Sequence, residues 1–306
     1  MKMGRRTFAV TLLAGVATSL LAHATDAQVG SRARNVVLVH GAYADGSSWS
    51  EVIPLLQRAG LNVTAVQNPL TSLADDVEAT RRVLALQDGP TVLVGHSWAG
   101  TVISEAGVDP KVSALVYVAA RAPDAGEDYA ALAAQFPAPP ASAGLVKSDG
   151  YAQLSEESFL QDFAGDLDPA RARILYAVQG RISVTLFASK TTQAAWRIKP
   201  TWYAVSTQDR TTSPELERFL AHRMKAKTIE LTSSHVSLLS HPQEIADLIL
   251  TAAGQKDSAR FDHLIESGVQ RSIEPIEING DYASRISEAP TTFGRAARAD
   301  SLRAAT

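Results

Sequence analysis

Short runs rich in Val, Ile and Leu alternate with segments of helical spacing along most of this chain. The runs are apolar throughout instead of alternating with polar residues, which is typical of strands covered on both faces. Such strands, each followed by a helix, form a parallel sheet with helices on both sides. The expected strands are residues 35–40, 62–67, 91–95, 112–119, 201–205 and 227–231, and the expected helices are residues 48–59, 72–86, 98–106, 214–223 and 242–252. The pattern predicts a doubly wound α/β core, mainly parallel, of about six strands.

The alternation stops between residues 121 and 199, where Ala, Pro, Asp and Ser dominate. Helices are expected there at residues 169–178 and 183–196. An insertion of this length between two strands predicts a helical cap over one end of the sheet, with residues 33–120 and 200–253 as the core. Residues 255–306 are polar without a sustained period, and we expect them to form a flexible tail.

The N-terminal residues 1–24 have a basic start, an apolar stretch and an A-x-A site that ends at Ala24. These are the features of an export signal peptide that is removed. The apolar stretch is short for a membrane span, which disfavours the alternative of an anchor helix. We therefore expect an exported protein, periplasmic or secreted, without stable membrane insertion. The pair Arg5 and Arg6 resembles a twin-arginine signal and leaves the export route open.

The balance of charged residues gives little support to a nucleic-acid partner. The chain has 29 Lys and Arg against 32 Asp and Glu, a formal net charge of −3, whereas nucleic-acid binding calls for a basic face. The chain has no cysteine, so it forms no disulfide bonds. We see neither a cluster of metal ligands nor a phosphate-binding loop, and we expect no metal and no organic cofactor. Nothing indicates the oligomeric state.

One serine lies among small residues where an expected strand becomes a helix, in the sequence GHSWAG of residues 95–100. A strand that reverses at once into a helix needs a tight backbone, and it holds the hydroxyl of Ser97 above the sheet. The unpaired N–H groups at the start of the helix, from Trp98, favour the oxyanion formed when Ser97 attacks a carbonyl carbon. Ala99 stands where the G-x-S-x-G motif usually has glycine, so a purely structural turn remains an alternative.

A serine hydroxyl needs a general base, and the base needs a carboxylate to orient it. His235 follows the last expected strand and Asp209 the strand before it, at the same edge of the sheet as Ser97. His241 is an alternative base, although it lies at the start signal of the last helix. Asp124, after an earlier strand, is the alternative acid. We predict Ser97, His235 and Asp209 as a catalytic triad.

The loop after the first strand is expected to complete the site. Gly41 allows this loop to turn back over the serine, so that the backbone N–H of Ala42 and that of Trp98 form an oxyanion hole. Aromatic residues of this loop and of the expected cap are candidates to line a substrate pocket, although core packing would also explain each of them: Tyr43, Phe136, Phe163 and Phe187.

These motifs resemble those of the α/β-hydrolase superfamily. The stretches are VLVHGAYADGSSW at residues 37–49, GHS at residues 95–97 and SHVSLLSHP at residues 234–242. They are similar to the branch that holds the plant methyl esterases, the hydroxynitrile lyases and related bacterial esterases, and the likeness extends over residues 33–253. The resemblance implies the α/β-hydrolase fold and a serine nucleophile, followed along the chain by the acid and then the histidine.

Two positions favour hydrolysis over the other reactions of related enzymes. The hydroxynitrile lyases carry a lysine after the catalytic histidine and a threonine after the first-strand histidine, where this chain has Val236 and Gly41. Dehalogenases and epoxide hydrolases of this fold use an aspartate in place of Ser97. We therefore expect a carboxylesterase that cleaves small to medium esters. A slow-turnover ligand-binding protein or receptor, and another triad reaction such as perhydrolysis or C–C cleavage, remain alternatives.

Overall fold

Six parallel strands form the central sheet in the order β2-β1-β3-β4-β8-β9. Every neighbouring pair is parallel. The strand order reverses direction beside β1, and ligands of doubly wound sheets bind at the carboxyl ends of the strands near such a point. The predicted α/β core is therefore confirmed. The strands are β1 (Asn35–Val39), β2 (Asn62–Ala65), β3 (Thr91–His96), β4 (Val112–Val118), β8 (Thr201–Ser206) and β9 (Lys227–Leu231).

The computed structural model describes residues 32–256. The expected export signal at residues 1–24 lies outside this range, and so does the expected tail apart from residues 255 and 256. Within the described range, no helix is long and apolar enough to cross a membrane.

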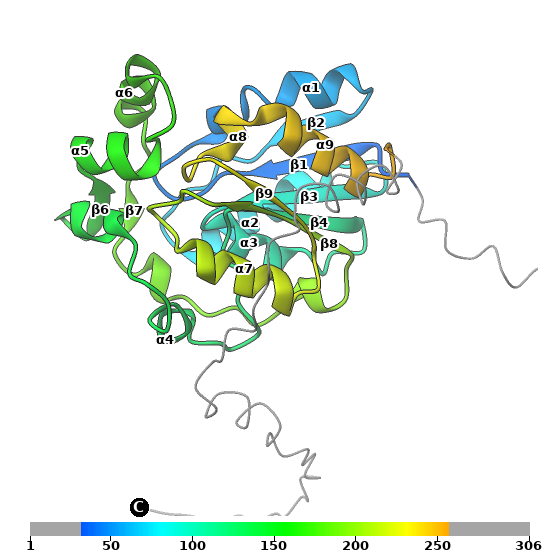
Figure 1. Ribbon diagram of the computed structural model, residues 1–306. Helices are drawn as coiled ribbons and strands as arrows, with labels where there is room; N and C mark the ends of the chain where they lie inside the picture. Colours follow the sequence, from blue (N-terminus) through cyan, green and yellow to red (C-terminus); the bar gives the residue numbers. More distant parts are fainter. Residues whose placement is uncertain (1–31, 257–306) are drawn as a thin grey trace, which may run out of the picture. The chain divides into compact units, whose positions relative to one another are not determined.

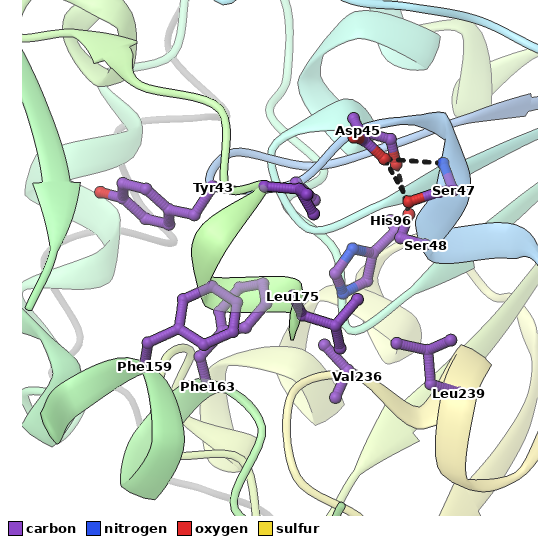
Figure 2. A pocket seen from close by; sticks show the side chains of 12 residues that line it. Tyr43, Asp45, Ser47, Ser48, His96, Phe159, Phe163, Leu175, Val236 and Leu239 are labelled. Atoms are coloured by element: carbon purple, nitrogen blue, oxygen red, sulfur yellow. Dashed lines mark hydrogen bonds between the residues drawn. The ribbon is translucent and has the colours of Figure 1, made fainter. Parts of the chain in front are cut away.

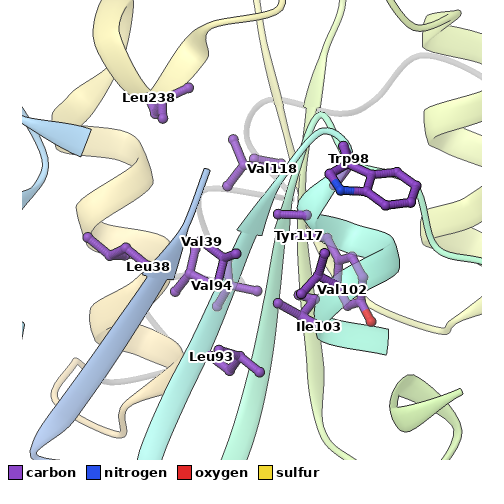
Figure 3. Close-up of a cluster of buried hydrophobic side chains, with 14 of the residues drawn as sticks. Leu38, Val39, Leu93, Val94, Trp98, Val102, Ile103, Tyr117, Val118 and Leu238 are labelled. Atoms are coloured by element: carbon purple, nitrogen blue, oxygen red, sulfur yellow. The ribbon is translucent and has the colours of Figure 1, made fainter. Parts of the chain in front are cut away.

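Helices cover both faces of the sheet (Figure 1). Helices α1, α8 and α9 lie on one face, and α2, α3 and α7 lie on the other. Every residue of β1, β3 and β8 is buried, which explains why these strands are apolar throughout. Figure 3 shows Leu238 over one face, and Val102 and Ile103 on the helix that covers the other. The helices are α1 (Ile53–Arg58), α2 (Leu73–Ala85), α3 (Ala99–Ala106), α7 (Pro214–Arg223), α8 (Ser237–Ser240) and α9 (Pro242–Ala252).

The helix expected at residues 48–59 is two separate elements. The Asp45 side chain accepts the N–H of Ser47 and begins a 3₁₀ turn, η1 (Gly46–Trp49), which ends before the next helix starts. Pro54 has no N–H and therefore favours the first turn of a helix, and α1 begins beside it.

The segment between β4 and β8 contains short helices and a small antiparallel sheet of order β5-β6-β7, which the sequence analysis did not predict. The helix expected at residues 169–178 is α6. The elements are α4 (Tyr129–Ala133), η2 (Pro140–Gly144), β5 (Leu145–Ser148), β6 (Tyr151–Leu154), α5 (Glu156–Ser158), the π-helical turn η3 (Phe159–Phe163), α6 (Pro169–Ala177), β7 (Ile182–Ser183), η4 (Leu186–Ala188) and η5 (Ala195–Arg197).

The prediction of a helix at residues 183–196 was wrong. Ser183 donates its N–H to the carbonyl of Leu70 at 2.9 Å, and Val184 donates its N–H to the carbonyl of Gly150 at 3.0 Å. In the middle of the segment, the N–H of Thr192 donates to the carboxylate of Glu105 at 2.6 Å, so it is not available for a helical bond. Only the two short turns η4 and η5 form in the rest of the segment.

Candidate active site

Strained backbone gathers at the carboxyl edge of the sheet. Tyr43, Ser97 and Ala119 follow β1, β3 and β4, and their φ angles are 60°, 53° and 44°. Positive φ is unfavourable for residues with a side chain, and it persists where the surrounding structure enforces it. The turns after three neighbouring strands are therefore held in unusual conformations, as are three residues elsewhere in the described range, Leu70, Asp149 and Lys225.

Three backbone hydrogen bonds hold the turn at Ser97. Its N–H donates to the carbonyl of Val118 at 3.1 Å, and its own carbonyl accepts the N–H groups of Gly100 and Arg121, each at 3.0 Å. These bonds join the turn between β3 and α3 to the end of β4. The Ser97 residue is only partly buried, so the turn presents its side chain at the edge of the sheet.

The glycines beside Ser97 are required by close contacts between backbones. A Cβ atom on Gly95 would lie 2.8 Å from the carbonyl oxygen of Ala99. A Cβ atom on Gly100 would overlap the carbonyl oxygen of Arg121. The tight turn inferred from the small residues of GHSWAG is therefore what the chain forms.

His235 and Asp209 are in direct contact below this edge. The Nδ1 atom of His235 lies 2.5 Å from Oδ2 of Asp209, and both side chains are completely buried. The other Asp209 oxygen accepts the N–H groups of Thr211 at 2.6 Å and Thr212 at 2.9 Å. An imidazole that donates Nδ1–H to a carboxylate keeps Nε2 as an acceptor. Within the described residues, Nε2 of His235 has no hydrogen-bond partner.

The alternative acid and base have other partners. Asp124 forms an ion pair with Arg197, whose Nε lies 2.8 Å from its carboxylate. The ring of His241 contacts the hydroxyl of the preceding serine at the start of α9. Asp209, and not Asp124, is therefore the acid that contacts His235.

His96 connects the turn at Ser97 with the loop of His235. Its Nε2–H donates to the carbonyl of His235 at 2.9 Å, and the two imidazole rings lie 4.8 Å apart. Complete burial holds the pKa of His96 well below its ordinary value, so the ring is neutral. The sequence analysis did not assign this role, although His96 stands beside the predicted nucleophile.

The loop after β1 packs directly on the serine turn. Nε2 of His40 accepts the N–H of Asn68 at 2.9 Å, and its Nδ1–H donates to the carbonyl of Gly41 at 2.9 Å, which fixes the start of the loop. None of the hydrogen bonds found among residues 32–256 uses the backbone N–H of Ala42 or of Trp98. Both predicted oxyanion donors are therefore without a protein acceptor in the described range.

A buried carboxyl group anchors the side chain of Trp98. The indole N–H donates to Oδ2 of Asp76 at 2.8 Å, and Oδ1 of Asp76 accepts the N–H of Leu70 at 2.8 Å. Burial raises the pKa of Asp76 to about 6, because the charged form is poorly solvated. The residue after Ser97 is thus tied to helix α2.

Asp76 should make stability depend on pH. Its folded pKa is about 6 against a reference value of 3.8, so between these values the folded protein keeps a proton that the unfolded chain has released. The stabilisation is present below the unfolded pKa and is lost as pH rises through the folded one, by about 3 kcal/mol. The free energy of unfolding is measured in urea at about pH 4 and pH 7. The loss of stability between about pH 4 and pH 7 that Asp76 causes should be present in the wild type and absent from Asp76→Asn. Equal changes in both proteins would contradict the raised pKa.

A small pocket adjoins these residues (Figure 2). Three of its lining residues, Tyr43, His96 and Val236, are chain neighbours of the predicted oxyanion donor, nucleophile and base. The segment between β4 and β8 supplies apolar side chains for another wall. The lining residues are Tyr43, Ala44, Asp45, Ser47, Ser48, His96, Phe159, Phe163, Leu175, Val178, Val236 and Leu239.

The four pocket candidates have different positions. Tyr43 and Phe163 line the pocket, with ring centroids 6.4 Å apart. Phe187 does not line it, but its ring lies 6.3 Å from that of Tyr43. Phe136 does not line this pocket either, and its ring packs on Phe219 of α7 at 5.4 Å. Further lining residues of the insertion, such as Phe159, carry no signal in the sequence, since tertiary folding alone brings them here.

Comparison with known proteins agrees with this geometry. The chain matches the model of the alpha/beta hydrolase family over residues 36–248. It is 25% identical over 244 residues to the alpha/beta hydrolase nvfD of Aspergillus novofumigatus, covering 72% of this chain and 96% of that protein. It is also 25% identical over 259 residues to methylesterase 2 of Arabidopsis thaliana, covering 72% and 97%. The crystal structure of a pyrethroid hydrolase from Sphingobium faniae JZ-2 superposes with a TM-score of 0.61 at 21% identity, covering 72% of this chain and 98% of that one. Because the family match spans more than half of the sequence, the chain belongs to the alpha/beta hydrolase family.

Proposed function

We propose that this protein is a serine carboxylesterase that hydrolyses small to medium esters through an acyl-enzyme on Ser97. The observation that carries the proposal is the hydrogen bond between His235 and Asp209. Nε2 of this imidazole has no partner among the described residues, the Ser97 hydroxyl included, and the proposal makes it the acceptor of the Ser97 proton during the reaction. The relative named methylesterase 2 is an esterase by its name, which supports the same class of substrate here.

The first half of the reaction forms the acyl-enzyme. The Oγ atom of Ser97 attacks the ester carbonyl carbon while Nε2 of His235 takes the hydroxyl proton. The Asp209 carboxylate accepts Nδ1–H and stabilises the imidazolium that results. The backbone N–H groups of Ala42 and Trp98 bind the oxyanion of the tetrahedral intermediate. When the intermediate collapses, the bond to the alcohol breaks and the alcohol leaves with the proton from His235.

The second half hydrolyses the acyl-enzyme by the same groups. Nε2 of His235 takes a proton from water, and the hydroxide attacks the acyl carbonyl carbon. A second oxyanion forms at the same site and collapses by breaking the bond to Ser97. His235 then returns its proton to the serine Oγ, and the carboxylic acid is released.

The pocket indicates an apolar group on the substrate. Aromatic and aliphatic side chains such as Phe163, Leu175 and Val236 form most of its wall. A wall of this kind favours an apolar acyl or alcohol part.

The proposal is tested with short-chain p-nitrophenyl esters and a serine-reactive phosphonate. We expect steady-state hydrolysis of the esters, stoichiometric loss of activity with the phosphonate, and the label on Ser97 in a peptide map by mass spectrometry. A label on a different residue would contradict the proposed nucleophile. A single burst followed by retention of the ligand would favour a binding protein instead.

Gly41→Ala should lower ester hydrolysis without removing any reacting group. The new Cβ atom would lie 2.7 Å from Cβ of Ser97 and 3.0 Å from the carbonyl oxygen of His96, so the serine turn or the loop has to move. A displacement of this kind is expected to reduce kcat/KM by about 100-fold.

The matched control for Gly41→Ala is Gly89→Ala. Gly89 lies in the loop before β3, and a Cβ atom there has no neighbour within 4 Å. We expect its kcat/KM to equal that of the wild type. If Gly41→Ala were as active as this control, the close packing of the β1 loop on Ser97 would have no importance for the reaction.

A further inference from the structure

A second buried carboxyl group, that of Glu217, lies close to Asp209. Glu217 is on α7, and its side chain is completely buried. Its Oε2 atom accepts the N–H of Ser206, at the end of β8, at 3.0 Å. Its Oε1 atom has no hydrogen-bond partner among residues 32–256. The carbonyl of the same Ser206 accepts the N–H of Asp209 at 3.2 Å, so both carboxyl-bearing residues are bonded to one residue at the end of β8.

Two neighbouring carboxyl groups in a buried site do not both ionise, because the charges repel and neither is solvated. Asp209 receives three donors, the N–H groups of Thr211 and Thr212 and Nδ1–H of His235. Glu217 receives one donor. The charge is therefore better stabilised on Asp209, and the proton belongs on Glu217.

The positive charge nearest to Glu217 has a weaker effect on it than burial and Asp209. Arg218, the next residue on the helix, forms a bidentate pair with Glu230 at 2.8 and 2.9 Å. The phenols of Tyr203 on β8 and Tyr129 on α4 face the same region, and both are uncharged, since burial raises the pKa of each. Within the described part of the chain, Glu217 forms no ion pair. Burial, followed by the charge of Asp209, raises the pKa of Glu217 well above its ordinary value.

We propose that Glu217 is a neutral carboxylic acid that positions Asp209, with Oε1–H donating to the aspartate carboxylate while Oε2 accepts the N–H of Ser206. Glu217 touches neither substrate nor the reacting atoms, so it is a positioning residue. Its hydrogen bond fixes the carboxylate toward His235 and reduces the negative charge that the imidazole experiences. The catalytic consequence rests on the proposed function, whereas the protonation of Glu217 does not.

The protonation is tested by infrared spectroscopy without any measurement of activity. At about pH 8, where exposed carboxyl groups and Asp76 are ionised, the wild type minus Glu217→Gln difference spectrum should contain the C=O stretch of a protonated carboxylic acid, above the amide I band. This band should shift in D₂O. The absence of such a band from the difference spectrum would overturn the proposal, since it would place the charge on Glu217.

The positioning role is tested by comparing two substitutions. Glu217→Gln keeps a donor for Asp209 and an acceptor for Ser206, whereas Glu217→Leu keeps the approximate volume and neither polar group. We expect kcat of Glu217→Leu to fall by about 10-fold below that of Glu217→Gln with little change in KM. The downfield proton resonance of His235 Nδ1–H should move in the leucine variant and stay close to the wild-type position in the glutamine variant.

The pH profile distinguishes a neutral Glu217 from a charged one. Loss of a nearby negative charge would destabilise the charged imidazolium, so the acid limb of kcat/KM would move to lower pH in Glu217→Gln if the wild-type residue were ionised. We expect the acid limb to stay in place. Glu215→Gln, an exposed position on the same helix, is the matched control and should have wild-type kinetics.

The outcomes separate the two proposals. Equal kcat values for Glu217→Leu and Glu217→Gln, or a shifted acid limb in Glu217→Gln, would overturn the positioning role. If Glu217→Leu does not fold, the infrared band and the acid limb of Glu217→Gln decide whether Glu217 is neutral and acts on Asp209. If the wild type hydrolyses no ester, the proposed function fails, and the infrared band together with the His235 resonance still decides whether Glu217 donates to Asp209.

Discussion

Ser97→Ala is expected to lower kcat/KM for ester hydrolysis by about ten-thousand-fold or more. The substitution removes the only atom that forms a bond to the substrate in the proposed reaction. The two backbone N–H groups and the pocket stay in place, so substrate binding should change little and a small residual rate is expected. Initial rates with a p-nitrophenyl ester, together with KM, measure both effects.

The matched control for Ser97→Ala is Ser113→Ala. Ser113 lies near the amino end of β4, away from the carboxyl edge, and its hydroxyl donates only to the carbonyl of Thr91 at 3.3 Å. Its removal should leave the rate unchanged. Hydrolysis that survives Ser97→Ala at a rate near that of the control would refute the role of Ser97 as nucleophile.

Asp209→Asn should be nearly as damaging, with a fall in kcat of about a thousand-fold to ten-thousand-fold. Asp209 accepts Nδ1–H of His235 on one oxygen and two backbone N–H groups on the other. An asparagine has only one acceptor oxygen, and if that oxygen keeps the backbone bonds, its NH₂ group faces Nδ1. The imidazole then carries its proton on Nε2, the atom that has to accept the proton of Ser97.

Asp124→Asn is the control that compares the two acids considered from the sequence. Asp124 pairs with Arg197, and the loss of that partly exposed pair should leave kcat close to the wild-type value. Measurement of kcat for both variants at a pH where the wild type is fully active distinguishes them. A large loss in Asp124→Asn with little loss in Asp209→Asn would mean that the acid has been assigned to the wrong loop.

The sheet was predictable because its strands are buried on both faces. Continuous runs such as Asn35–Val39 and Thr91–His96 are apolar for that reason, and the burial is encoded residue by residue. Helices α7 and α9 begin at the predicted residues, each with a proline in the first turn, since proline needs no helical N–H partner there. The turn at Ser97 was predictable from the small residues around it.

The insertion was much less predictable. Residues 183–196 have enough apolar residues for a helix, but backbone groups in the segment bond to partners far away in the sequence, such as the N–H of Thr192 to the Glu105 carboxylate. The pocket has the same origin, because Phe159 of the insertion and Val236 after β9 line it together. No local pattern specifies such a meeting.

The residues within each short segment determined the strands, the helix starts and the glycine-lined turn that carries Ser97, because periodicity, capping and steric contact act between near neighbours. Only the tertiary structure decided that His235 binds Asp209 and not Asp124, that His96 holds the loop of His235, and that Glu217 is buried against Asp209. The bond from His96 to His235 spans 139 positions of the chain. Contacts of that kind depend on how the sheet brings its strand ends together, which no single segment encodes.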